Sequence, residues 1–167
     1  MGLIASRRGL RRIFLPQVSQ RATELLLNKY LGNAVVDEQP FGDLPYRLKS
    51  YLNGEPVTFP DSLDLASATP FQQSIWLAAR SIPYGETRSY GWLACEVGKP
   101  KASRAAGQAL ARNPLPIVIP CHRVIAHNGN LGGFSGGEKL KQYLLEMEKS
   151  TRYESKHNGI LPYPEEL

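Results

Sequence analysis

Cysteine, histidine and long apolar runs are all scarce in this chain of 167 residues. It holds two cysteines, Cys95 and Cys121, and three histidines. Two cysteines cannot build a disulfide framework, and no cysteine and histidine pattern has the spacing of a metal site. The longest apolar run, Leu115 to Ile119, is interrupted by Pro116 and is far shorter than the roughly 20 residues that cross a membrane. These absences exclude a disulfide-rich secreted domain, a zinc module and a membrane protein.

What is present is an ordinary globular composition with an uneven charge. Hydrophobic residues make up 42% of the chain, and the formal net charge is +5. Residues 71–125 hold seven basic and two acidic residues, a balance typical of a phosphate-backbone binder, although a solvated surface has the same charge signature. We expect an α+β fold: a small N-terminal α/β lobe over 1–68, a mostly helical lobe over 69–150, and a C-terminal tail over 151–167.

The first lobe is predicted to begin with a β-hairpin. Gly2–Ser6 and Leu10–Leu15 have the pattern of two short strands, joined by a turn at residues 7–9. Helices are expected over Ala22–Leu31 and from about Pro45 to Leu52.

The first residues also fit two targeting patterns. Gly2 and Ser6 match a myristoylation motif, and the arginines that follow resemble a transit peptide. The hairpin is the preferred interpretation, so we expect the protein in the cytoplasm, or in the nucleus of a eukaryote.

The second lobe is predicted to contain a helix-turn-helix. Thr69 to Gln72 combines an N-cap, a proline at the first helical position and a glutamine at the third, which form a capping box. Helices are expected over about 70–82, 90–97 and 102–112, and the last two make the helix-turn-helix. The third is rich in small residues around Arg104, so one of its faces is a candidate to enter a nucleic-acid groove. Tight packing between helices is the alternative.

Cys121 is the candidate nucleophile. Residues 114–119 are predicted to form a buried strand that leads to Cys121 and His122. A histidine that accepts the thiol proton would leave a thiolate, which is the nucleophilic form of cysteine. Neighbouring side chains on a strand point to opposite faces, so a water bridge is the expected route. In the alternative, Cys121 only fills the core, as we expect Cys95 to do.

A glycine-rich loop follows at Leu131–Gly137. Four glycines around Phe134 and Ser135 would let backbone N–H groups approach a flat ligand. Ser135 and Glu138 form a second predicted capping box, at the start of a helix that ends near Lys149. Glu148 lies beside the buried stripe of that helix and is a candidate to orient an imidazole.

Together these motifs resemble the O6-alkylguanine-DNA alkyltransferase (methylated-DNA–protein-cysteine methyltransferase) family. The resemblance rests on Asn113-Pro114, the run from Ile119 to Ile125, Ser89-Tyr90 and Arg104, and it covers residues 69 to about 150. It implies DNA repair by direct damage reversal. After base flipping, the alkyl group of O6-alkylguanine would move irreversibly to Cys121 in a single turnover. Whether O4-alkylthymine is also a substrate is left open by the sequence. Double-stranded DNA would be bound through the minor groove by a monomer without a cofactor or a metal.

The resemblance also assigns roles to residues. It implies a catalytic group in which Cys121 accepts the alkyl group, His122 takes the thiol proton, Glu148 orients His122, Asn113 braces the turn and Tyr90 protonates the departing base. The implied DNA-binding residues are Ser103, Arg104, Ala105, Gly107, Lys101 and again Tyr90. The implied base pocket consists of Val124, Phe134, Ser135 and Gly136.

Three departures from the family pattern stand out in the sequence. Phe134 stands where some relatives carry a tyrosine. Its ring can still stack on a base, but the hydrogen bond of a tyrosine hydroxyl is absent. The family's first lobe usually begins with a strand some residues earlier, so we expect that strand to be absent here. Because no cysteine precedes Cys95, we also expect the zinc site that some relatives carry in this lobe to be missing.

Three other functions share some of these motifs. A binding-only relative would recognise the lesion without transferring its alkyl group, but such proteins carry tryptophan in place of the cysteine. A Cys-His hydrolase needs an oxyanion hole and a catalytic pair on separate elements, whereas Cys121 and His122 are neighbours in the chain. A transcription regulator needs a recognition helix with base-reading side chains, which the small residues around Arg104 do not provide.

Overall fold

The computed structural model describes residues 1–15, 19–32, 35, 37 and 41–157. It begins with strands β1 (Gly2–Ser6) and β2 (Gly9–Phe14), which pair antiparallel and confirm the predicted hairpin. The hairpin leans on a later segment, since Leu10 exchanges backbone hydrogen bonds with Ser62 and Asp64 at 2.8 Å. Gly9 lies at this approach with φ +133, and a Cβ there would meet the Ser62 carbonyl oxygen at 2.3 Å.

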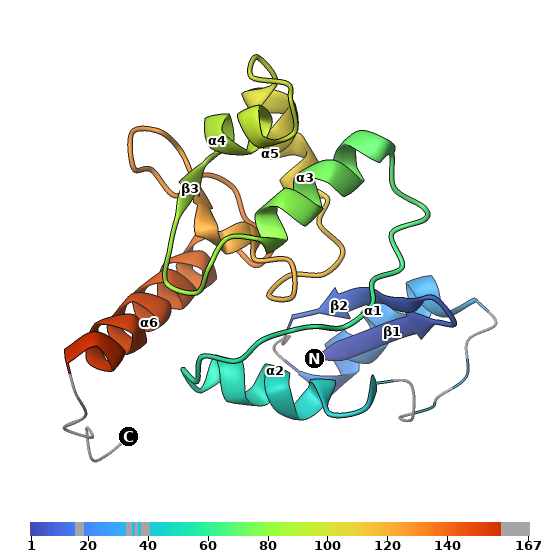
Figure 1. Ribbon diagram of the computed structural model, residues 1–167. Coiled ribbons are helices and arrows are strands. Elements are labelled where there is room, and N and C mark those ends of the chain that lie inside the picture. The colour runs from blue at the N-terminus through green and yellow to red at the C-terminus, as the bar shows by residue number, and fades with distance from the viewer. Residues whose placement is uncertain (16–18, 33–34, 36, 38–40, 158–167) are drawn as a thin grey trace.

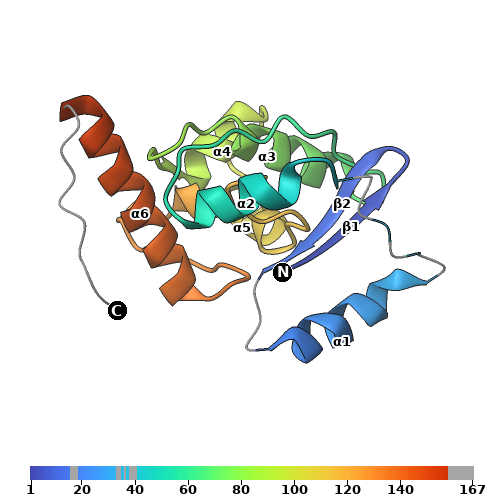
Figure 2. The ribbon, with the colours of Figure 1, turned by 90° about the horizontal axis from the view of Figure 1, so that it is seen from below.

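Two helices complete the N-terminal region. Helix α1 (Gln20–Leu31) is capped by Ser19, and Gly32 follows it as predicted. Helix α2 (Leu44–Leu52) buries Leu44, Leu48 and Tyr51 on one face. In Figure 1 these helices and the hairpin occupy the lower part of the molecule, and Figure 2 shows α1 at its margin.

Three helices pack together in the upper part of Figure 1: α3 (Pro70–Arg80), α4 (Tyr90–Glu96) and α5 (Ser103–Ala111). The predicted capping box is present at the start of α3, where Thr69 and Gln72 bond each other's backbone. The indole of Trp76 donates to the Ala109 carbonyl at 2.9 Å and joins α3 to α5. The α4–α5 pair has the arrangement of the predicted helix-turn-helix.

The remaining elements lead to the candidate site. Strand β3 (Arg88–Ser89) pairs parallel with β4 (Val124–Ile125), and the short 3-10 helix η2 (Cys121–Arg123) precedes β4. Helix α6 (Glu138–His157) packs against η2. Among the described helices, none is both long and apolar enough to cross a bilayer.

The predicted strand over 114–119 is wrong. The segment is buried, but it folds into turns, with one isolated bridge between Pro116 and Ile119 and Ile117 at φ +77. Prolines at 114, 116 and 120 supply no N–H groups, so the segment cannot pair as a central strand.

Helix α6 also differs from its prediction. It starts at Glu138 directly after Gly137, whose φ is +84, so Ser135 lies too far upstream to be its N-cap. The helix continues to His157, past the predicted end near Lys149.

One hydrophobic core runs through both predicted lobes. Its buried residues come from β2, α2, α3, α4, α5, the 115–119 turns and α6. The backbone N–H of Ile13 in β2 donates to the Pro114 carbonyl at 2.9 Å. The N-terminal region is therefore packed directly behind the segment that carries Cys121.

Candidate active site and DNA-binding face

Asn113 holds the turn that positions Cys121. Its side-chain N–H group donates to the Ile119 carbonyl at 2.9 Å and to Cys121 Sγ at 3.0 Å. Its side-chain oxygen accepts from the Leu115 backbone N–H at 2.9 Å. One amide side chain thus ties both ends of the proline-rich turns to the sulfur, which explains how an irregular segment places a nucleophile accurately.

Cys121 is a protonated thiol at rest. Its residue is 5% exposed, and this burial raises the pKa of the thiol. The hydrogen bond from Asn113 and the charge of Lys141 lower the pKa without cancelling the effect of burial. A nearby base must therefore remove the proton before the sulfur attacks.

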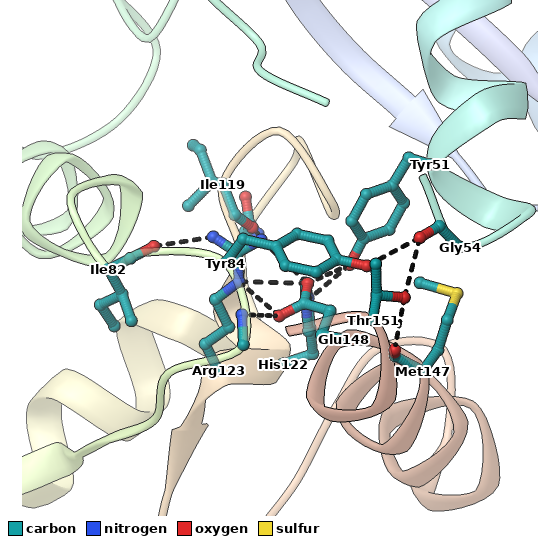
Figure 3. Close-up of polar contacts among 12 residues, drawn as sticks. Tyr51, Gly54, Ile82, Tyr84, Ile119, His122, Arg123, Met147, Glu148 and Thr151 are labelled. Atoms are coloured by element: carbon teal, nitrogen blue, oxygen red, sulfur yellow. Dashed lines mark hydrogen bonds and ion pairs between the residues drawn. The ribbon is translucent and has the colours of Figure 1, made fainter. Parts of the chain in front are cut away.

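The next residue, His122, belongs to a buried polar network (Figure 3). Its Nε2 lies 2.8 Å from Glu148 Oε1 and 2.9 Å from the Tyr51 hydroxyl. The Tyr51 hydroxyl donates to the same Glu148 oxygen at 2.5 Å. All three residues are completely buried.

Glu148 accepts hydrogen bonds from three segments of the chain: α2, η2 and the residues before β3. Besides Tyr51 and His122, it accepts from the Arg123 guanidinium at 2.9 Å and from the Gly85 backbone N–H at 3.0 Å. Burial alone would raise the pKa of this carboxyl, but the hydrogen bonds from His122 and Arg123 outweigh it and lower the pKa to about 2. Glu148 is therefore an anion that only accepts hydrogen bonds.

This arrangement selects one form of the imidazole. Burial lowers the pKa of His122, although Glu148 works against it, so the ring is neutral near pH 7. Because Nε2 faces an anionic acceptor, it carries the proton. The other nitrogen, Nδ1, is buried and makes no hydrogen bond to any residue that the structure describes. Nδ1 is thus the lone pair available to take a proton.

Lys141 fastens the glycine-rich loop beside the thiol. Its buried ammonium donates to the Val124 carbonyl at 2.6 Å and to the Leu131 carbonyl. Burial lowers the pKa of Lys141 to about 8, against the opposing influence of Cys121. The lysine both holds the loop and favours the thiolate when the thiol proton leaves.

A groove of about 550 Å³ opens on the face of the helix-turn-helix. It is lined by Ser89, Tyr90, Ser103, Arg104, Gly107 and Gly132, among others. Tyr90 is wedged between α5 and the loop. A Cβ on Gly107 would lie 3.6 Å from its ring, and one on Gly132, whose φ is +67, would lie 2.6 Å from its hydroxyl oxygen. The glycines let both segments close on the tyrosine.

Comparison with known proteins agrees with this chemistry. The family described as 6-O-methylguanine DNA methyltransferase, DNA binding domain, matches residues 70–150. A methylated-DNA--protein-cysteine methyltransferase of Methanosarcina acetivorans is 47% identical over 116 residues, which are 70% of this chain and 74% of that protein. This chain belongs to the methylated-DNA–protein-cysteine methyltransferase family.

Solved structures of the family share the fold. Mycobacterium tuberculosis OGT in complex with DNA matches with a TM-score of 0.74 and 40% identity, over 89% of this chain and 86% of that one. The O6-methylguanine-DNA methyltransferase of Pyrococcus kodakaraensis matches with a TM-score of 0.63 and 31% identity, over 87% and 88%. The predicted family and α+β fold class are confirmed.

The structure brings most of the residues that the family resemblance singled out into two groups. Asn113, Cys121, His122 and Glu148 form the buried centre, and Phe134 meets the His122 ring edge-on at 6.3 Å between centroids. The second group lines the groove or lies exposed on α5 and just before it. It consists of Tyr90, Lys101, Ser103, Arg104, Ala105 and Gly107.

The predicted base pocket is more scattered. Ser135 and Gly136 line a separate cavity of about 370 Å³, together with Asn113 and residues of β2. The Val124 carbonyl already accepts from Lys141. Cys95 differs outright from its prediction, because it is exposed on α4 instead of packed.

Sequence reasoning missed three members of the buried centre: Tyr51, Arg123 and Lys141. Arg123 adjoins His122, and Lys141 shares a helix face with Leu144 and Glu148, so charged residues on an apolar stripe were a usable signal. Tyr51 lies 71 residues before His122 and carries no comparable local signal.

Proposed function

We propose that this chain repairs O6-alkylguanine in DNA by transferring the alkyl group to its own Cys121, irreversibly and once per molecule. The observation that carries the proposal is a buried thiol held by Asn113 next to a histidine whose Nδ1 is free to accept a proton. The relatives named methylated-DNA--protein-cysteine methyltransferase support the same reaction.

The proposed reaction begins with proton transfer. The thiol proton passes to His122 Nδ1 through a bridging water, and Glu148 stabilises the imidazolium across its 2.8 Å contact with Nε2. The thiolate then attacks the alkyl carbon of the lesion. An S–C bond forms, the C–O6 bond breaks and its electron pair stays with the guanine.

Tyr90 is the proposed acid. As the leaving guanine gains negative charge, the Tyr90 hydroxyl donates a proton to it, and guanine departs neutral. Burial raises the pKa of Tyr90, so the hydroxyl holds its proton until the base becomes basic enough to take it. The thioether at Cys121 has no leaving route, which makes the protein a single-use reagent.

The groove is the proposed DNA-binding face. The alkyl carbon is inaccessible to in-line attack within a stacked duplex, so the nucleotide must flip out at a cost of a few kcal/mol. Arg104, exposed on α5, is proposed to fill the vacated space, with α5 in the minor groove. The structure of OGT with DNA supports DNA binding at this fold. We expect a monomer acting where DNA is found, in the cytoplasm or in a nucleus.

Mass spectrometry tests the proposal. Wild type, Cys121→Ser and Cys95→Ser are each incubated with a duplex that holds one O6-methylguanine, and the digested peptides are weighed. We expect a gain of one methyl group on the Cys121 peptide in wild type and in Cys95→Ser, and none in Cys121→Ser.

The same experiment separates the alternative of a binding-only protein. Tight binding to the lesion duplex without any mass gain would assign that function instead. If the protein neither gains mass nor binds the lesion duplex, both functions are refuted.

A further inference from the structure

Tyr51 joins the N-terminal region to the buried catalytic network. It is the largest fully buried side chain that the structure describes, and it reaches the network from α2. Its ring packs edge-on against Phe59 at 5.9 Å and Tyr84 at 6.1 Å. Those contacts need only the ring, so packing does not explain why this residue carries a hydroxyl.

The hydroxyl has one satisfactory proton arrangement. Glu148 is ionised and can only accept, so Tyr51 must donate to its Oε1. The lone pairs of the Tyr51 oxygen then face His122 Nε2 at 2.9 Å, which favours a proton on that nitrogen. Burial beside Glu148 raises the pKa of Tyr51 far above its usual value, so the hydroxyl does not ionise.

Glu148 and Tyr51 therefore have opposite effects on the charge of the imidazole and the same effect on the position of its proton. An unshared carboxylate would pull a second proton onto His122, since an anion favours the charged ring. By donating to the same oxygen that Nε2 contacts, Tyr51 takes up part of that negative charge. Both partners place the existing proton on Nε2 and leave Nδ1 as the base.

We propose that Tyr51 is a positioning residue for alkyl transfer: its hydroxyl holds His122 in the neutral Nε2–H form, so that Nδ1 can accept the Cys121 proton. The proposal rests on the proposed function, and it makes the N-terminal region part of the reaction centre. Other charged or titratable groups around the His122 ring are Glu148 and Lys141 on α6 and Arg123 and Cys121 on η2. Tyr84, before β3, packs against Tyr51.

The test compares two tyrosine-to-phenylalanine variants. Tyr51→Phe keeps the ring and removes the hydroxyl from the network. Tyr84→Phe is the matched control, because its hydroxyl lies close by but donates to the Gly54 carbonyl at 3.2 Å. Single-turnover methyl transfer from a lesion duplex is measured from pH 5 to 9 for both variants and wild type, together with duplex affinity and melting temperature.

For Tyr51→Phe we expect about a tenfold slower transfer above neutral pH, because the tautomer is less well fixed. We also expect the acid limb of the pH profile to move up by about one unit, as Glu148 acts more strongly on His122. Duplex affinity should not change. Tyr84→Phe should keep the wild-type pH profile, whatever its melting temperature.

Two results would overturn the inference: a Tyr51→Phe profile that superimposes on wild type, or an equal loss of rate in both variants without a shift along the pH axis. Failure of wild type to transfer at all would instead refute the proposed function. If Tyr51→Phe does not fold, the tautomer of His122 is read from ¹⁵N spectra of histidine-labelled wild type. The His122 signals are identified as those that are missing from the spectrum of His122→Gln. A proton on Nδ1 would contradict the proposal.

Discussion

The buried centre and the groove beside α5 are built from different kinds of residue. In the centre, Tyr51, His122 and Glu148 are fully buried and bonded to one another. In the groove, Arg104 is exposed and its neighbours on α5 are small. The centre sets protonation states by hydrogen bonding, whereas the groove, which is the proposed DNA-binding face, leaves open space beside α5.

This difference implies that the rate of methyl transfer and the affinity for the duplex depend on different regions of the molecule. A change in the centre should slow transfer and leave duplex binding intact, because none of its three members reaches the surface. A change in the groove should affect reaction with the duplex more than reaction with a free alkylated base. Substitutions in each region test that separation.

Glu148→Gln should slow methyl transfer by about 100-fold or more, because an amide cannot stabilise the imidazolium as an anion does. Single-turnover rates with a lesion duplex measure this, and gel-shift affinity should stay at the wild-type value. Glu146→Gln, exposed two residues earlier on α6, is the matched control. Equal rates for the two variants would show that Glu148 has no role in methyl transfer.

Stability should also depend on Glu148 at acid pH. Its pKa is about 2 in the folded protein against an ordinary 4.5, so the unfolded state binds more protons below about pH 4.5. The stabilisation, about 3 kcal/mol, is complete above that pH and is lost as the pH falls toward 2. Denaturant unfolding from pH 7 to 2 should show this decline in wild type and a shallower one in Glu148→Gln. Parallel curves would contradict it.

Gly132→Ala tests the contact between the loop and Tyr90. The new Cβ would meet the Tyr90 hydroxyl at 2.6 Å in a backbone conformation that alanine disfavours, so transfer should fall about 20-fold. Gly133→Ala has an ordinary φ and open space, and its effect should be much smaller. Comparable losses in the two variants would show that the loop, and not its fit to Tyr90, matters.

Arg104→Ala should reduce transfer from a lesion duplex about tenfold, because nothing fills the space that the flipped base leaves. Reaction with free O6-methylguanine should be unchanged, since no base needs flipping. Lys49→Ala removes one positive charge from the exposed face of α2 and controls for long-range electrostatics. Equal losses with both substrates would place Arg104 in the reaction instead.

Local features were predictable from the sequence. The hairpin, the Thr69 capping box and the α4–α5 pair follow from turn residues and spacing over a few positions, and the structure confirms them. The bonds from Asn113 to Cys121 and from Glu148 to His122 agree with the roles that the family resemblance implied.

Long-range packing was not predictable. Tyr51 meets His122 across 71 positions, and no periodicity encodes that meeting. The 114–119 segment was misjudged because its apolar residues resemble a strand, while its prolines remove the N–H donors that a strand needs. Cys95 was misjudged because a helical apolar pattern did not reveal which face is covered.

The most direct test of the central claim is a titration of wild-type protein with increasing amounts of duplex that carries one isotopically labelled O6-methylguanine. The account predicts that transfer stops at one methyl group per chain, all of it on Cys121, however much duplex is added. Repair of several lesions per chain, or label on Cys95, would contradict single-use transfer to Cys121.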